Sequence, residues 1–293
     1  MKSKHLLLLL PAAAIAGVVL AQGPLTPTGA PAPVMKTLDQ IEPRTPISGL
    51  PFTISQSGSY YLTRNLQFTA ASGVAITIAA NDVTLDLMGF TLSSTALVSD
   101  AAISVSGDSK GLCIINGNIA GTTTVTTSGN SPNRVWQINA GGFRHAVTAV
   151  FADGCRLADL HIRGCREEGI IAGERALVER IRAEHNGGNG IEIRDHGQVS
   201  QCFVSLSGEN GIYAARGTVT GTTVVDNKNS GMQVSYGIVS SCSARDNGGT
   251  GLSAFDGVVS FSTATGSGAG GGSVVYSEIS ASGGTRTGNN PTP

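Results

Sequence analysis

The chain has 293 residues, of which 40% are hydrophobic and 13% charged, and its formal net charge at pH 7 is -1. A balance this close to neutral excludes a general electrostatic attraction to nucleic acid or to anionic membranes. The 40 glycines and 5% aromatic residues fit tightly turned repeats, and the periodic apolar positions described below exclude a disordered chain.

The first 21 residues have the pattern of a secretory signal peptide. Lys2 and Lys4 form a basic start, the stretch 6–20 is apolar, and the small residue Ala21 ends a cleavage site. We therefore predict a mature protein without an integral membrane segment, located outside the cell, in the periplasm or at the cell surface. An uncleaved N-terminal anchor is the alternative.

Residues 22–46 form a proline-rich lead-in with six prolines. Proline at that density cannot pair in a sheet, so we expect a flexible or extended segment. One domain is predicted to follow over residues 47–285, with a loop insertion at about 120–145. A loose tail is expected over 286–293.

From residue 169 onward, a glycine followed by an apolar residue recurs about every twenty residues. Successive glycines are 21, 21, 20 and 20 residues apart. This period is typical of a stacked solenoid, in which each repeat buries its apolar face against its neighbours. The pairs are Gly169-Ile170, Gly190-Ile191, Gly211-Ile212, Gly231-Met232 and Gly251-Leu252, with a weaker Gly271-Gly272.

The interior of each repeat predicts three short strands. After the glycine, apolar and polar residues alternate, as in Ile191-Glu192-Ile193, which indicates a strand with one buried face. A valine such as Val199 marks a second strand, and inward residues such as Cys202 and Val204 mark a third. Helical repeats need about 33 residues or more, so the pattern favours a parallel β-helix.

One polar position recurs four residues before each next glycine. Asparagine tolerates left-handed backbone and caps turns with its side chain. Stacked at one corner of the coils, these residues are expected to form a ladder of side-chain hydrogen bonds. They are Asn186, Ser207, Asn227, Asn247 and Ser267.

With these repeats, the chain resembles the right-handed parallel β-helix proteins of the pectin-lyase-like superfold. The stretches 50–62 and 76–92 are similar to the opening of many secreted bacterial β-helix proteins of largely unassigned function. The resemblance covers residues 47–285 and implies an all-β solenoid of about nine coils of 20–23 residues. It says little about activity, because one fold hosts many functions.

The five cysteines leave at least one thiol unpaired if every disulfide is intramolecular. Cys202 and Cys242 share one inward register two coils apart, near 10 Å, which is beyond disulfide reach. A Cys155–Cys165 pair stays open. No spacing indicates a zinc site.

Outward positions on the first strands suggest a groove for a glycan. Residues in one register on successive coils lie about 5 Å apart, close to the length of a sugar ring. Tyrosines there suit stacking on pyranose faces, and charged or amide groups suit hydroxyls and uronate carboxylates. The candidate binding residues are Arg194, Tyr213, Arg216, Gln233 and Tyr236. The alternative is an ordinary solvated sheet face.

Charge is concentrated in one part of the chain. Sixteen of the 39 Asp, Glu, Lys and Arg residues lie between Asp153 and Asp195. Glu192, Asp195 and His196 adjoin the expected groove and are the best candidates for acid–base catalysis. Some of the remaining charge is expected to be structural, in surface pairs of little energetic value.

The insertion at about 120–145 holds the only tryptophan, Trp136. Long interruptions in compact domains are often functional. One hypothesis folds this loop over the groove, with Trp136 as a further binding residue. The other packs Trp136 and its loop onto the edge of the coils.

The catalytic motifs of related enzymes do not transfer to this chain. The Asn-Thr-Asp, Asp-Asp, Gly-His-Gly and Arg-x-Lys pattern of polygalacturonases is absent, and Asp195-His196-Gly197 matches only in part. No aspartate trio supports calcium as in pectate lyases, so no cofactor is expected, although calcium stays open. Arg194 or Arg216 is the only candidate lyase base.

Three functions remain open from the sequence. The leading hypothesis is an exported β-helix that presents a side groove to a polysaccharide or surface glycan. The second is a polysaccharide lyase or glycoside hydrolase acting on acidic polysaccharide. The third is a structural or adhesive spacer. Neither enzymatic activity nor the oligomeric state follows from the sequence.

Overall fold

The computed structural model describes residues 43–129, 133–266 and 274–276. The chain divides into two units, Met1–Pro43 and Arg44–Pro293, and every described strand lies in the second. The predicted signal peptide, most of the lead-in and the tail fall outside the described residues. Among the residues that are described, no helix is long and apolar enough to cross a membrane.

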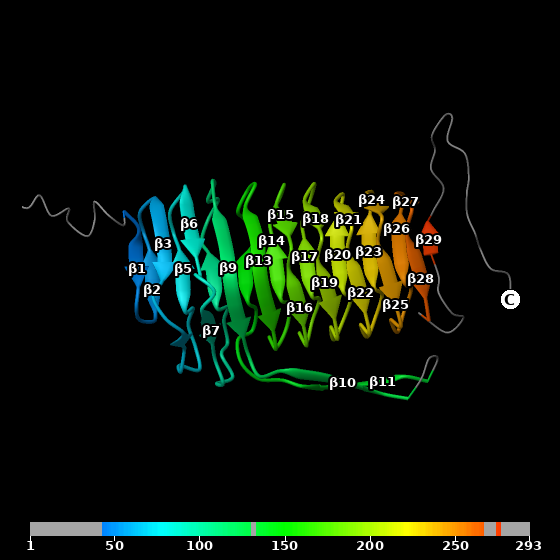
Figure 1. The fold of residues 1–293 in the computed structure, drawn as a ribbon, viewed down its shortest axis with the longest axis horizontal. Helices are drawn as coiled ribbons and strands as arrows, with labels where there is room; N and C mark the ends of the chain where they lie inside the picture. Colours follow the sequence, from blue (N-terminus) through cyan, green and yellow to red (C-terminus); the bar gives the residue numbers. More distant parts are fainter. Residues whose placement is uncertain (1–42, 130–132, 267–273, 277–293) are drawn as a thin grey trace, which may run out of the picture. The chain divides into compact units, whose positions relative to one another are not determined.

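The predicted parallel β-helix is confirmed, and each coil contributes one strand to a ten-stranded parallel sheet (Figure 1). We call its members first strands. They are β2 (Phe52–Ile54), β5 (Ile76–Ile78), β8 (Ile103–Val105), β12 (Val147–Ala149), β14 (Ile170–Ala172), β17 (Ile191–Ile193), β20 (Ile212–Ala215), β23 (Met232–Ser235), β26 (Leu252–Phe255) and β29 (Val274–Tyr276).

The second and third strands of the coils join in one 17-stranded sheet, because two long strands run through both positions. These long strands are β9 (Cys113–Ala120) and β13 (Arg156–Arg163). The second strands are β3 (Gly58–Leu62), β6 (Val83–Asp86), β15 (Leu177–Glu179), β18 (Gln198–Ser200), β21 (Thr218–Thr220), β24 (Ile238–Ser240) and β27 (Val258–Ser260). The third strands are β4 (Leu66–Gln67), β7 (Thr91–Ser93), β16 (Arg182–Glu184), β19 (Phe203–Ser205), β22 (Thr223–Val225), β25 (Ser243–Arg245) and β28 (Thr263–Thr265), and β1 (Thr45–Ile47) pairs with β3.

Stacked identical positions build the core. Ile170 pairs with Ile191 and Ile191 with Ile212, and all three side chains are fully buried. The valines predicted for the second strands stack in the same way, as in the pairing of Val178 with Val199. Since each coil covers the apolar face of the next, the core runs continuously through the stack.

Each coil turns from its first strand to its second through a residue with positive φ. In the coils that begin with β14, β17, β20, β23 and β26, these φ angles lie between 46° and 60°. The residue that follows is a glycine or, in one coil, Ala176, so the chain turns in little space. The positive-φ side chains are exposed, and they therefore form one column on the surface. The column consists of Arg175, His196, Arg216, Tyr236 and Asp256.

The residues of the predicted ladder lie at the turn before each first strand, and among the described coils the side-chain hydrogen bond between ladder members is confirmed for Asn227 and Asn247. Asn227 Nδ2 donates to Asn247 Oδ1 at 2.9 Å, and Asn227 Oδ1 accepts the backbone N–H of Ser207 at 3.0 Å. Ser207 is too short to continue the ladder. Among the described residues, Asn186 Nδ2 and Ser207 Oγ are therefore buried without a hydrogen-bond partner. The fifth predicted member, Ser267, lies outside the described residues.

The insertion expected as a loop at about 120–145 contains an antiparallel hairpin. Its strands are β10 (Thr124–Ser128) and β11 (Val135–Asn139), and Thr127 pairs with Trp136. The run of threonines at 122–124 and 126–127 supplies the β-branched residues that favour extended backbone. Figure 1 shows the hairpin lying lengthwise beside the coils.

The hairpin packs on the turns that follow the third strands. Trp136 Nε1 donates to the carbonyl oxygen of Asp226 at 3.1 Å, and Arg134 forms an ion pair with the carboxylate of Asp226. His185 Nδ1 lies 3.0 Å from the carbonyl oxygen of Val125. Trp136 therefore lies at the coil edge, the second of the two placements considered, and not with Tyr236.

All five cysteines are free thiols, so the Cys155–Cys165 disulfide that the spacing left open is not formed. Burial raises the pKa of Cys155 and of Cys202 to about 11 and that of Cys165 to about 12. Buried neutral thiols of this kind serve as small apolar core residues.

Candidate functional site

The first strands present a continuous outward face. Glu192 pairs with Tyr213, and Tyr213 with Gln233, so the three side chains follow one another on successive coils. All three are half-buried. The predicted register of this face is confirmed. At one end it meets the turns with positive φ, and at the other the turns that lead in from the third strands.

At the first of these ends, three side chains of consecutive coils line a shallow, open hollow of about 470 Å³. They are His196, Arg216 and Tyr236. All three belong to the column of positive-φ residues, so their spacing equals that of the coils. We call this hollow, together with the exposed Arg194, the turn surface. The sequence predicted Arg194, Arg216 and Tyr236 as binding residues, and the structure brings them to this one edge.

The turn surface carries more cationic than anionic groups. Arg216 forms an ion pair with Asp195 at 3.0 Å, but its side chain is still 55% exposed. Arg194 makes no ion pair with any residue that the structure describes. Two guanidinium groups beside an exposed aromatic ring suit a ligand with carboxylates and apolar faces.

The three predicted catalytic residues contact different neighbours. Asp195 engages Arg216, and His196 lines the hollow. Glu192 accepts a hydrogen bond from Asn189 Nδ2 at 3.2 Å. Asn189 lies in the turn before the first strand, whereas Asp195 and His196 lie in the turn after it. The structure thus places two of the three candidates at the turn surface and directs Glu192 to the opposite end.

That opposite end is acidic. Glu167, Glu168, Glu192 and Glu209 come from three successive coils. Partial burial and repulsion by Glu168 and Glu192 raise the pKa of Glu209 above its usual range. The outward face of the first strands therefore has arginine and aromatic side chains at the hollow and a cluster of glutamates across the strands.

Sequence reasoning missed this acidic end. Its glutamates are 17 to 42 residues apart or adjacent in sequence, and only stacking brings them together. A usable signal was present: Glu167-Glu168 precedes Gly169, and Glu209 precedes Asn210-Gly211, so both occupy equivalent places in the repeat. Phe255 was also not among the predicted binding residues. In the structure its ring makes a T-shaped contact with that of Tyr236, with the ring centroids 5.8 Å apart.

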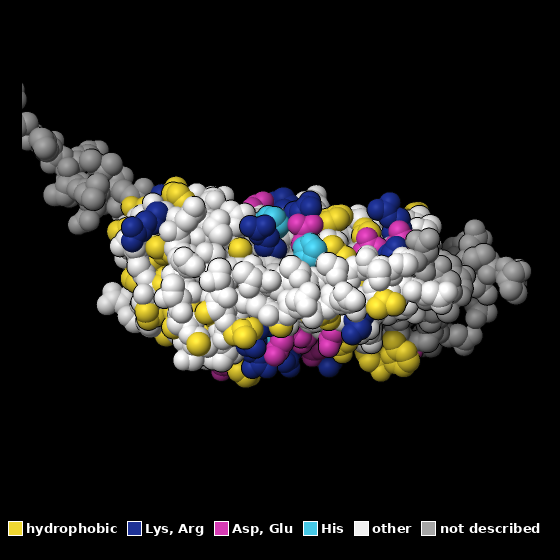
Figure 2. Space-filling model, turned by 90° about the horizontal axis from the view of Figure 1, so that it is seen from below, with side chains coloured by type: hydrophobic (Ala, Val, Ile, Leu, Met, Phe, Trp, Pro, Cys, Tyr) yellow, Lys and Arg dark blue, Asp and Glu magenta, His cyan; other side chains and the backbone are white. Residues whose placement is uncertain are grey.

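Charged side chains elsewhere form structural pairs. Figure 2 shows them gathered along two edges of the molecule, separated by a band of uncharged side chains. On the third strands, Arg182 binds both oxygens of Glu184 at 2.7 Å, and His161 lies 3.1 Å from the same carboxylate. Arg180 binds Asp159 through two nitrogens. These groups are engaged with one another, as expected from the sequence for some of the charge, although the partners differ from those in register.

Comparison with known proteins supports the fold. Residues 145–285 match a family model described as a right handed beta helix region. No curated protein matches the chain. The enzymatically active domain of tailspike protein 2 from bacteriophage CBA120 is similar, with a TM-score of 0.54 and 14% identity over 80% of this chain and 38% of that one.

Two further solved structures are more distant. ORF18 of Geobacillus virus E2 has a TM-score of 0.47 and 10% identity, covering 76% of this chain and 53% of that one. The A-module of the Azotobacter vinelandii mannuronan C-5 epimerase AlgE4 has a TM-score of 0.44 and 11% identity, covering 73% and 70%. The chain thus spans about 38% of the tailspike domain and about half of ORF18.

Proposed function

We propose that this chain, a right-handed parallel β-helix protein, binds an acidic polysaccharide along its turn surface. The observation that carries the proposal is the hollow of about 470 Å³ lined by His196, Arg216 and Tyr236 on three consecutive coils. Coils about 4.8 Å apart repeat at close to the length of one sugar residue. A polymer lying along the stack can therefore meet one side chain of the column at each coil.

The charge of the two edges favours an acidic ligand. Arg194 and Arg216 supply guanidinium groups that bind carboxylates through paired hydrogen bonds. The acidic end repels the same polymer and so directs it to the turn surface. The exposed ring of Tyr236 offers an apolar face on which a pyranose can stack, and Tyr213 and Gln233 extend the contact across the strands.

Binding is favoured over catalysis by the separation of the candidate groups. The tailspike domain shows that a related solenoid supports enzymatic activity. In this chain, however, Asp195 is paired with Arg216, and Glu192 is engaged by Asn189. Glu192, Asp195 and His196 remain the candidate residues for a hydrolase or lyase. The predicted signal peptide places the proposed binding in the periplasm, at the cell surface or outside the cell.

Replacing Tyr213 and Tyr236 together with alanine is expected to weaken binding of an acidic polysaccharide by about 30-fold. This corresponds to about 1 kcal/mol for each ring. The measurement is retention on a panel of immobilised acidic and neutral polysaccharides, with mass spectrometry of the soluble products. The wild type is expected to be retained by acidic polymers without releasing oligosaccharides.

A matched control is Phe203→Ala, which removes a half-buried aromatic ring from a third strand, where it contacts Arg182. This variant should be retained like the wild type. Equal retention of the double variant and the wild type would refute the site. New oligosaccharides in the soluble fraction would establish an enzyme instead, and Asp195→Asn would then test the catalytic candidates.

A further inference from the structure

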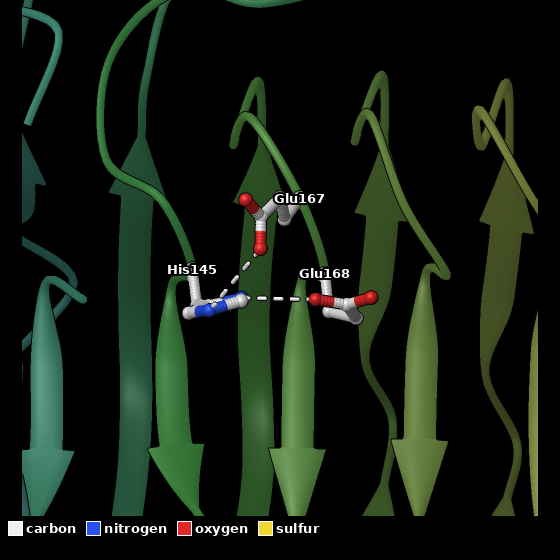
Figure 3. Close-up of side chains that lie close together, drawn as sticks. All are labelled: His145, Glu167 and Glu168. Carbon is white, nitrogen blue, oxygen red and sulfur yellow. Dashed lines mark ion pairs between the residues drawn. The ribbon is translucent and has the colours of Figure 1, made fainter. Parts of the chain in front are cut away.

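The turns that lead into the first strands bring a histidine and two glutamates together. The backbone N–H of Glu167 donates to the carbonyl oxygen of Arg144 at 2.8 Å, so equivalent residues of two coils lie side by side. This register sets His145, just before β12, beside Glu168, just before β14. Figure 3 shows both carboxylates facing the imidazole from the neighbouring coil, with an ion pair drawn from the ring to each.

The distances suit a shared ion. His145 Nδ1 lies 3.1 Å from Glu168 Oε2, and His145 Nε2 lies 3.7 Å from Glu167 Oε2. One ligand atom from each residue can be chosen so that all three lie within 4.8 Å of one another. A zinc ion with ligands about 2.1 Å away holds its ligand atoms about 3 to 4 Å apart, so small side-chain shifts close the site.

The histidine is the unusual member of this group. Its side chain is only 12% exposed, and its buried Nδ1 faces Glu168 Oε2 at 3.1 Å as its one neighbouring polar partner within the described part of the chain. A buried imidazole nitrogen that faces a carboxylate oxygen needs a proton or a cation between the two acceptors. A cation held between the ring and the carboxylates would meet that need.

The surroundings add negative charge and space. Arg144 Nε binds Glu167 Oε2 at 2.7 Å and is the one cation in direct contact with the cluster among the described residues. On the next coils, Glu192 and Glu209 bring further carboxylates, and Glu168 contributes to the repulsion that raises the pKa of Glu209. Gly188 lies beside Glu168 Oε1, where a Cβ would approach that oxygen to 2.9 Å. A side chain at position 188 would therefore crowd the cluster.

We propose that His145, Glu167 and Glu168 bind a divalent first-row transition ion, with Zn²⁺ as the representative. One imidazole and two carboxylates suit zinc or manganese, whereas calcium takes six to eight oxygen ligands. Because the ligands come from two coils, the ion joins the coil of β12 to that of β14. The proposal is independent of polysaccharide binding at the turn surface.

The test is calorimetric titration of the untagged full chain with ZnCl₂, together with thermal unfolding at increasing Zn²⁺. One ion should bind per chain. At 100 times the dissociation constant, the unfolding temperature should rise by roughly 5 °C, because only the folded state assembles the site. The absence of both binding and a thermal shift would overturn the proposal.

Substitution of the histidine separates this site from other surface groups. His145→Gln should weaken Zn²⁺ binding by more than about 100-fold, since loss of even an outer-shell partner often costs 10- to 100-fold. The matched control is His161→Gln, because His161 also faces a glutamate, Glu184, but Arg182 occupies both of its oxygens. Equal loss in the two variants, or no loss in His145→Gln, would contradict the assignment.

A third variant tests the chemistry without removing a ligand. Arg144→Gln removes the cation that competes for Glu167 and should strengthen Zn²⁺ binding by up to roughly fivefold, the value of an exposed ion pair. Tighter binding would support the carboxylates as ligands. Unchanged or weaker binding would count against Glu167 as a ligand.

Discussion

Replacing Gly237 with alanine is expected to lower the free energy of unfolding by about 3 kcal/mol, at the upper end for overpacking. Gly237 follows Tyr236 at the turn surface. A Cβ there would overlap the carbonyl oxygen of Gly217 on the preceding coil and approach Val234 Cγ1 to 2.7 Å. Since the obstacle is backbone, the two coils must separate and their sheet hydrogen bonds must lengthen. Urea unfolding followed by circular dichroism measures the loss.

The same change at Gly197, two coils earlier, is a matched control. At Gly197, a Cβ would lie 3.1 Å from the carbonyl oxygen of Ala176, and Ala176 itself already carries a Cβ at the equivalent place in its coil. Gly197→Ala should therefore cost less than about 1 kcal/mol. Equal stability losses at the two glycines would mean that close stacking does not shape the turn surface.

Replacing Asn227 with leucine is expected to cost about 3 kcal/mol, because it leaves the buried backbone N–H of Ser207 unpaired and removes the side-chain hydrogen bond to Asn247. Asn227 is fully buried, accepts the backbone N–H of Ser207 and donates to Asn247 Oδ1. The leucine side chain cannot accept the Ser207 N–H, and Asn247 Oδ1 keeps only the hydrogen bond from the backbone N–H of residue 227. Thermal unfolding of the variant should begin at a lower temperature, and hydrogen exchange should rise first at the Ser207 amide.

Two further substitutions serve as a control and as a test in the opposite direction. Asn229→Leu places the same side chain at an exposed position of the same turn and should change stability little. Ser207→Asn should add about 1 kcal/mol, because it offers Asn186 Nδ2 the acceptor that the ladder lacks. A stabilised Asn227→Leu variant would show that the ladder contributes specificity of stacking and not stability.

The repeat made the fold predictable. In a solenoid each position meets its own equivalent on the next coil, so a period of 20 or 21 residues gives the register directly. Glu192, Tyr213 and Gln233 were placed on one face in this way, and so was the ladder of Asn227 and Asn247. The hairpin β10–β11 was missed because it breaks the period, and the choice between a loop and two paired strands depends on contacts with distant coils.

The candidate site was predictable only in part. The turn after the first strand was located from the sequence, because Arg216 and Tyr236 follow their glycines at the same offset. The sequence did not show which charged side chains meet one another at the two ends of the first strands. Glu192 was grouped with Asp195 as a catalytic candidate because the two are close in sequence, whereas its side chain accepts a hydrogen bond from Asn189. His145 lies beside Glu168 only because two coils stack on one another. Side-chain direction within a turn does not follow from a repeat.

The central claim, that the turn surface binds an acidic glycan, is tested most directly by titrating an acidic oligosaccharide into Arg216→Gln and Arg180→Gln. Both arginines are exposed, have positive φ and bind an aspartate, but Arg180 follows a second strand. We expect at least about tenfold weaker binding for Arg216→Gln, the value of a charge-assisted hydrogen bond, and wild-type affinity for Arg180→Gln. Equal affinity of the two variants for the oligosaccharide would contradict the account.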